Sequence, residues 1–291
     1  NKIFKQTKKM AITSITITGT WILYYELDSV YASKLYNVQT AAFLAIGITL
    51  LTFSRSLMNM FFGPFQVKFN QLRGLKDEKA LSYWFLRLIE WSFPISIIPT
   101  IVIIILMRPL IVSWIGFDFI ESIVIGRILI ATLFAAFLLS PISYLAMARE
   151  KYKFLLISSI TLPLFYFLIF LCLESQIGFL ALPVAKLATV SINLLINLYL
   201  VKDVITESLT KILMSIVKHM IMPLFLMAVL LLALHPFWDI EIGKNTFALL
   251  KVVGIGSCCV ILPMGLYYII NPYTRAFIFT KVKQLKRGYH T

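Results

Sequence analysis

Long apolar runs dominate this sequence and restrict its fold more than any motif does. Residues 93–107 and 223–234 are two such runs, each flanked by further apolar turns. A helix that rises about 1.5 Å per residue needs roughly 20 apolar residues to cross ~30 Å of hydrocarbon. No alternating ten-residue pattern typical of a membrane β-barrel is present in the sequence. Since 60% of the residues are hydrophobic, the sequence predicts an all-α, polytopic integral membrane protein.

The apolar runs divide into about eight predicted membrane-spanning helices. Six of them form a predicted bundle within residues 1–200, two more lie within 201–270, and a basic tail covers 271–291. The polar, amphipathic segment VKFNQLRGLKDEKALSYW, between the second and third spans, is predicted to form a short interfacial helix. The predicted spans are 10–36, 40–66, 83–107, 122–147, 154–173, 178–200, 212–235 and 246–270.

The net charge of +14 lies mainly in short segments between the apolar runs. This placement is typical of the cytoplasmic loops of a membrane protein and argues against nucleic acid as a partner. We therefore expect a multi-pass membrane protein with both termini in the cytoplasm. The expected outer side carries Lys34, Arg108 and Lys244. The expected cytoplasmic side carries Lys2, Lys5, Lys8, Lys9, Lys68, Arg73, Lys76, Lys79, Arg149, Lys151, Lys153, Lys202, Lys211, Arg275, Lys281, Lys283, Lys286 and Arg287.

The sequence contains no pattern that predicts catalysis, a metal site or a cofactor. The largest expected outer loop, residues 108–121, is too short for a catalytic domain. No phosphate-binding loop or metal-ligand spacing occurs. The three cysteines lie within apolar segments and are expected to be buried small residues. The histidines are scattered. The residues concerned are Cys172, Cys258, Cys259, His219, His235 and His290.

Ionisable and amide side chains inside the predicted spans are expensive, because a charge near the bilayer centre costs at least about 2.5–3.5 kcal/mol. Arg55 lies near the middle of its span. Lys186 is followed by Asn193 and Asn197 at spacings that place all three on one helix face. Two interpretations stay open for the cations: each neutralises Glu26 or Asp28 as a structural pair, or each lines a wet cavity. For the two asparagines, hydrogen bonds between helices are the simpler interpretation.

The first predicted span carries acids and aromatic residues in its outer half. Trp21, Tyr24 and Tyr31 follow helical spacing around Asp28, and Glu26 lies next to this stripe. A lumen with buried cations suits an anionic substrate, and aromatic side chains beside it suit sugar rings. The candidate substrate-binding residues are therefore Arg55, Lys186, Asp28, Tyr24, Tyr31, Trp21, Asn193 and Asn197. Elsewhere, Arg87 and Glu90 are expected to pair on their own helix.

Three stretches of the sequence resemble a known family. These are LYYELDSVYASKLYNVQTAAFLAIG, the loop FFGPFQVKFNQLRGLKDEKA and SYLAMAREKYKFLLISS, together with the outer turn PLIVSWIGFDF. They are similar to the C-terminal half of Wzx-type polysaccharide flippases, within the MATE-like flippase superfamily. The resemblance covers about residues 1–200 and implies the second six-helix bundle of such a protein, followed by two extra helices. Because the chain begins at Asn1, we expect it to be part of a longer gene product.

The resemblance implies a transporter of O-antigen or lipopolysaccharide biosynthesis in a bacterial cytoplasmic (inner) membrane, not an enzyme. Its substrate would be an undecaprenyl-pyrophosphate-linked oligosaccharide, and membrane lipids and a polysaccharide polymerase would be its other partners. Asp28 or Glu26 would couple transport to an ion gradient. Three alternatives remain: a MATE-type exporter of cationic drugs, a polytopic polymerase or ligase of the same pathway, and a purely structural membrane subunit.

Overall fold

The computed structural model describes residues 2–200, 208–234 and 244–270, and almost all of them are helical. No β-strand occurs in these three ranges. The long helices there are α1 (Lys2–Tyr25), α3 (Val38–Gly74), α4 (Glu78–Trp114), α5 (Ser122–Ala148), α6 (Tyr152–Ile177), α7 (Ala181–Leu200), α8 (Leu209–Leu234) and α9 (Thr246–Ile270). The short helix α2 (Asp28–Leu35) follows α1, and single 3-10 turns precede α5 and α7. The prediction of an all-α fold is confirmed.

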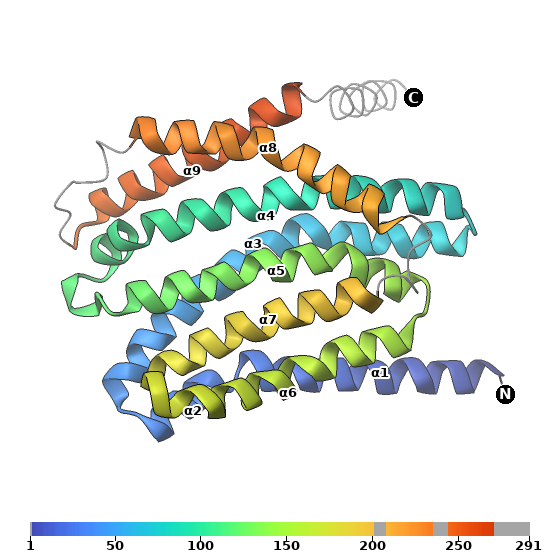
Figure 1. The fold of residues 1–291 in the computed structure, drawn as a ribbon, viewed down its shortest axis with the longest axis horizontal. Coiled ribbons are helices and arrows are strands. Elements are labelled where there is room, and N and C mark those ends of the chain that lie inside the picture. Colours follow the sequence, from blue (N-terminus) through green and yellow to red (C-terminus); the bar gives the residue numbers. More distant parts are fainter. Residues whose placement is uncertain (1, 201–207, 235–243, 271–291) are drawn as a thin grey trace, which may run out of the picture.

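The long helices lie side by side, and the turns between them gather at two ends of the molecule (Figure 1). The α3–α4 and α5–α6 turns share one end with the start of α1. The α4–α5 and α6–α7 turns lie at the opposite end. Helices α8 and α9 pack on α4, away from α1 and α6 (Figure 1). This arrangement is that of a polytopic helical membrane protein.

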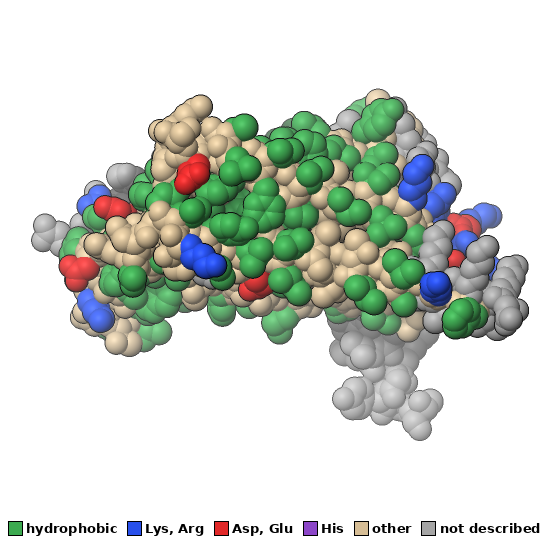
Figure 2. Space-filling view, turned by 90° about the horizontal axis from the view of Figure 1, so that it is seen from below, with side chains coloured by type: hydrophobic (Ala, Val, Ile, Leu, Met, Phe, Trp, Pro, Cys, Tyr) green, Lys and Arg blue, Asp and Glu red, His purple; other side chains and the backbone are tan. Residues whose placement is uncertain are grey.

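Five helical segments in the described ranges are long and apolar enough to cross a membrane: Val38–Gly74, Glu78–Trp114, Ser122–Ala148, Tyr152–Leu200 and Thr246–Ile269. The 49-residue segment turns back on itself between α6 and α7, so it supplies two spans (Figure 1). In Figure 2, basic side chains gather mainly toward one end of the visible face, and hydrophobic side chains spread over its middle. This distribution is typical of a bilayer-embedded surface.

The main hydrophobic core lies where α5 packs between α3 and α4. Two glycines allow this close approach. A Cβ atom at Gly47 would lie 3.4 Å from the backbone nitrogen of Gly126, and one at Gly126 would lie 2.9 Å from the sulfur of Met107. Small residues at helix crossings are the usual solution inside a membrane, because close packing replaces the hydrophobic effect there. A second, smaller core joins α4 to α8 and α9.

The structure corrects two predicted helix boundaries. The first predicted span, 10–36, is interrupted after Tyr25, and a separate short helix begins at Asp28. The predicted interfacial helix is wrong: its residues extend α3 to Gly74 and start α4 at Glu78, leaving only a tight turn. The segment between Val67 and Gly74 contains neither proline nor an earlier glycine, so nothing stops α3 at the membrane surface. The side chain of Asp77 then caps α4 by accepting a hydrogen bond from the backbone N–H of Ala80.

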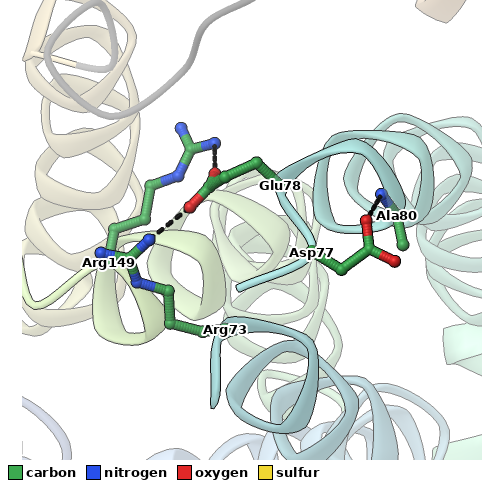
Figure 3. A network of polar contacts seen from close by, with 5 residues as sticks. All are labelled: Arg73, Asp77, Glu78, Ala80 and Arg149. Atoms are coloured by element: carbon green, nitrogen blue, oxygen red, sulfur yellow. Dashed lines mark hydrogen bonds and ion pairs between the residues drawn. The ribbon is translucent and has the colours of Figure 1, made fainter. Parts of the chain in front are cut away.

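The carboxylate of Glu78 links the ends of three helices at this turn. Glu78 of α4 accepts hydrogen bonds from Arg73 of α3 and from Arg149, which directly follows α5, the latter at 2.9 Å (Figure 3). Both arginines come from the basic loops recognised in the sequence. Because all three helices also pack on one another, the network holds the end of a single bundle.

Candidate functional site

The break between α1 and α2 places a carboxylate against a lysine in the interior of the bundle. Asp28 occupies the first turn of α2, and its side chain forms an ion pair with Lys186 of α7. The two side chains are 2% and 1% exposed. Two charges this deeply buried persist only when they satisfy each other and gain further hydrogen bonds. In this structure Lys186 is therefore a member of a structural ion pair, which is one of the two interpretations that the sequence left open.

Two tyrosines complete the surroundings of this pair. The Tyr166 hydroxyl of α6 donates a 2.6 Å hydrogen bond to the second carboxylate oxygen of Asp28. The Tyr24 hydroxyl of α1 donates a 2.8 Å hydrogen bond to the backbone carbonyl of Lys186. Both rings are fully buried and lie edge to face, 5.6 Å apart. Helices α1, α2, α6 and α7 are thus joined through one polar cluster, in which Tyr24 and Asp28 face protein.

Arg55 of α3 is held in a different way. Its guanidinium carbon lies 4.2 Å from the ring centroid of Tyr25 and 4.7 Å from that of Trp21. No carboxylate within the described ranges lies within ion-pair distance of Arg55, and its buried Nη1 atom has no hydrogen-bond partner there. Trp21 keeps 42% of its surface exposed. The site therefore contains a cation that aromatic rings support and no acid neutralises.

The remaining predicted site residues lie at other places. Asn193 donates hydrogen bonds of 2.8 Å to the Ser158 carbonyl and to the Thr161 hydroxyl, which joins α7 to α6. Asn197 donates to Asn193 on its own helix, at 2.7 Å to the backbone carbonyl. Tyr31 packs against rings on α6, with centroids 5.6 and 6.3 Å apart. These three side chains contribute to helix packing in this structure.

Glu26 lies at the break itself and is exposed. It is close to Asp28 in sequence, but Asp28 alone of the two pairs with Lys186. The structure thus brings Tyr24, Asp28 and Lys186 together, and it places Trp21 beside Arg55.

An exposed polar face runs along α3 next to Arg55. Helix positions three, four and seven apart share a face, and the exposed side chains at these spacings carry hydroxyl and amide groups. Hydrogen bonds within the helix satisfy two of the hydroxyls. This polar face comprises Thr49, Thr52, Ser56 and Asn59.

A second exposed face of α3 is apolar. It forms one wall of a groove of about 560 Å³ between α3, α4 and α9. Phe53, Leu57 and Phe61 line it from α3, and Val102 and Gly256 line it from α4 and α9. One helix therefore presents hydroxyl groups on one side and hydrocarbon on another at the same depth.

Sequence reasoning did not identify Tyr25, Tyr166 or the polar face of α3. Tyr166 lies 138 positions from Asp28, and no sequence spacing indicates that contact. The face of α3 carried a usable signal, since Thr49, Thr52, Ser56 and Asn59 follow helical spacing around Arg55. Tyr25 also carried a usable signal, because it lies four positions after Trp21 and three before Asp28.

Other polar groups do not join this site. Arg87 and Glu90 pair on α4 at 2.6 Å, as their spacing predicted. Cys259 is buried, as predicted, whereas Cys172 and Cys258 are exposed, and the prediction of buried cysteines is wrong for these two. Within the described residues, no group of three or more His, Cys, Asp or Glu side chains is arranged to hold a metal ion. His235, His290 and the basic tail lie outside the described residues.

The fold and the charged cluster within it define a polytopic helical membrane protein with a cationic site at membrane depth. No protein-family model matches the chain, and a search of curated proteins finds no relative. The function must therefore be argued from the site.

Proposed function

We propose that this protein is a transporter that moves an undecaprenyl-pyrophosphate-linked oligosaccharide across the cytoplasmic membrane for the synthesis of a cell-surface polysaccharide. The observation that supports this proposal most directly is Arg55. It lies near the middle of α3, a 37-residue helix, and carries a positive charge that no described carboxylate neutralises. A pyrophosphate would supply the missing anion through charge-assisted hydrogen bonds.

The surroundings of Arg55 suit the rest of such a substrate. Trp21 offers an exposed ring beside the guanidinium, and the hydroxyl and amide groups of the polar face extend along α3 on both sides of Arg55. An aromatic ring can cover the face of a sugar, and hydroxyl groups can exchange hydrogen bonds with it. The oligosaccharide would follow this polar face while its lipid tail remains in the bilayer.

The alternative of a cationic-drug exporter finds less support. A lumen for cations needs free carboxylates in the bundle interior. The buried acid, Asp28, is already bound to Lys186 and Tyr166, and Glu26 lies exposed at the α1–α2 break. A polymerase or ligase would need a large outer loop, yet α4 and α5 are joined by only a short turn between Trp114 and Ser122. For coupling to an ion gradient, we propose Glu26, the exposed carboxylate at the α1–α2 break, with Asp28 acting through its buried pair.

Substitution of Arg55 tests this function. In proteoliposomes that contain the full-length protein, Arg55→Ala should raise KM for the lipid-linked oligosaccharide by about ten- to a hundred-fold, because a hydrogen bond to a charged group contributes about 1.5–3 kcal/mol. Arg55→Lys should retain part of the affinity, since it keeps the charge but loses donor geometry.

The control is Arg127→Ala. Arg127 is an exposed arginine whose Nε donates to the Ile104 carbonyl on α4, away from the site. It should leave KM unchanged. An unchanged KM in Arg55→Ala as well would refute the proposed role of Arg55.

A further inference from the structure

Arg55 is held differently from the three arginines that form ion pairs in the described part of the chain. Arg73 and Arg149 share the carboxylate of Glu78, and Arg87 is paired with Glu90. Arg55 instead lies against two aromatic rings of α1, although it is deeper in the membrane than the loop arginines. The bundle has therefore placed a permanent, partly buried cation near the middle of α3 without giving it a counter-ion among the described residues.

Aromatic rings stabilise a cation without neutralising it. The electron-rich face of a ring attracts a guanidinium but accepts no strong hydrogen bond from it, so the N–H groups stay available. A carboxylate at the same place would occupy two of those N–H groups in a bidentate pair. In this structure the Nη1 atom of Arg55 has no hydrogen-bond partner among the described residues. Because the atom is buried, an anion reaches it only when the surrounding side chains move.

The two rings also form a unit. Trp21 and Tyr25 lie one helical turn apart on α1, with centroids 5.0 Å apart and planes tilted by 44°. Tyr25 is half-buried and makes the closer contact with Arg55, whereas Trp21 is the more exposed ring. Tyr25 also lies 5.3 Å from the ammonium of Lys186, so the same ring lies near both the paired cation and Arg55.

We infer that Tyr25 and Trp21 are positioning residues that fix the Arg55 guanidinium and keep its N–H groups free for the diphosphate of a lipid-linked substrate. This inference rests on the proposed function and deepens it, because it names the residues that keep Arg55 ready to bind. In the absence of these rings, Arg55 would adopt other rotamers or draw water into the site, and the anion would lose its preorganised partner.

The test is a double-mutant cycle on transport by the full-length protein in proteoliposomes, with undecaprenyl diphosphate that carries one sugar as the probe. Tyr25→Leu should raise KM about ten-fold with little change in kcat, and Tyr25→Phe, which keeps the ring, should restore most of the affinity. Trp21→Leu, at an exposed position that tolerates substitution, should raise KM by a smaller factor. In an Arg55→Ala background, Tyr25→Leu should add no further increase, because the group it positions is gone.

Tyr83→Leu is the matched control. Tyr83 also lies over an arginine, 5.3 Å from the guanidinium carbon of Arg87, but Glu90 already neutralises that arginine. It should leave KM unchanged. Thermal unfolding of each variant separates a loss of positioning from a loss of stability.

Two outcomes would overturn the inference, and they are distinguishable. If Arg55→Ala raises KM but Tyr25→Leu does not, or if the two effects multiply in full, the rings do not act through Arg55 and the proposed function stands. If Arg55→Ala itself leaves KM at the wild-type value, both the proposed function and this inference fail.

Discussion

Asp28 and Lys186 form the most deeply buried ion pair among the described residues. Each is almost completely excluded from solvent, and each has the other as its only oppositely charged partner among the described residues. Removal of one member of a buried pair typically costs about 3–5 kcal/mol, because the remaining charge has no compensation. Replacement of both by apolar groups is often nearly neutral.

The pair therefore predicts a specific pattern of stability. Lys186→Met alone and Asp28→Leu alone should each lower the free energy of unfolding by about 3–5 kcal/mol. Each should therefore lower the amount of folded protein in the membrane. The double variant should recover most of it. Thermal unfolding of detergent-purified protein, followed by tryptophan fluorescence, measures this directly.

Tyr166→Phe serves as a graded control, since it removes one hydrogen bond to Asp28 and leaves the ion pair in place. It should cost about 1–3 kcal/mol. Equal stability of the wild type and both single variants would show that the charges are not buried together in the membrane.

Sequence reasoning identified the costly residues and named Glu26 or Asp28 as the acid that would neutralise them, but it did not predict which cation meets which acid. The depth of Lys186, Asp28 and Arg55 follows from the apolar runs that surround them. Which cation meets the acid depends on how α1, α2 and α7 pack, and those contacts join residues 158 positions apart. The choice between a structural ion pair and a cation in a cavity therefore required the structure. Lys186 is paired with Asp28, and Arg55 is not paired with any described acid.

At the scale of a helix, α3 has two exposed faces of opposite chemistry at equal depth. Thr52 and Ser56 belong to the polar face, and Phe53 and Leu57 to the apolar groove. An exposed Asn59 amide on the polar face would be poorly compatible with lipid, because an unsatisfied polar group in hydrocarbon costs several kcal/mol. We therefore expect the polar face to line a water-filled lumen.

Cysteine labelling distinguishes the two faces. In a full-length protein from which Cys172, Cys258 and Cys259 have been removed, Thr52→Cys and Ser56→Cys should react with a water-soluble maleimide. Phe53→Cys and Leu57→Cys, one residue further along the same helix, should react slowly or not at all. Labelling of the groove positions in preference to the polar face would reverse the assignment of the two faces.

The crossing of α3, α4 and α5 makes a second prediction at this scale. Gly126→Ala would place a Cβ atom 2.9 Å from the Met107 sulfur, so Met107 or the helices must shift. It should destabilise the protein by about 1–3 kcal/mol, the usual cost of overpacking.

Gly254→Ala on α9 provides the control, because nothing lies within 4 Å of its Cβ position. It should be neutral or slightly stabilising, since alanine favours a helix over glycine. A comparison of the two unfolding temperatures gives the result. Equal stability of both variants would contradict the close packing at Gly126.

Apolar periodicity was sufficient to place the helices, but their ends depend on local chemistry. Predicted spans 122–147, 212–235 and 246–270 agree with α5, α8 and α9 to within a few residues. The interruption after Tyr25 was not predicted, because no proline or glycine marks it. It coincides with the turn at which Asp28 reaches Lys186 and Tyr166, so a tertiary contact accounts for it.

For the whole molecule, the positions of the turns predict the topology in the membrane. The α3–α4 and α5–α6 turns lie at the same end as the start of α1, and these segments hold most of the described lysines and arginines (Figure 1). We propose that this end is cytoplasmic. An alkaline phosphatase fusion at Gln39 should be active, and one at Lys76 should be inactive. The opposite pattern would invert the orientation. A further fusion at Ile242 should be active, although this position lies outside the described residues.

The sequence predicts the fold class of this protein more directly than it predicts the transported substrate. An all-α membrane protein follows from composition and is confirmed by the helices. The transported substrate rests on a resemblance and on the charge of Arg55, and it stays a proposal. The support from Trp21 and Tyr25 became visible only when α1 and α3 were placed side by side.

The most direct measurement of the central claim is movement of substrate between leaflets by the full-length protein in proteoliposomes. An external glycosidase would cleave only oligosaccharide in the outer leaflet, so its extent of reaction reports translocation. We predict that wild-type protein raises the cleaved fraction of undecaprenyl-diphosphate-linked oligosaccharide toward completion, that Arg55→Ala does so far more slowly, and that a lipophilic cationic dye is not moved. Transport of the dye without movement of the lipid-linked oligosaccharide would contradict the account.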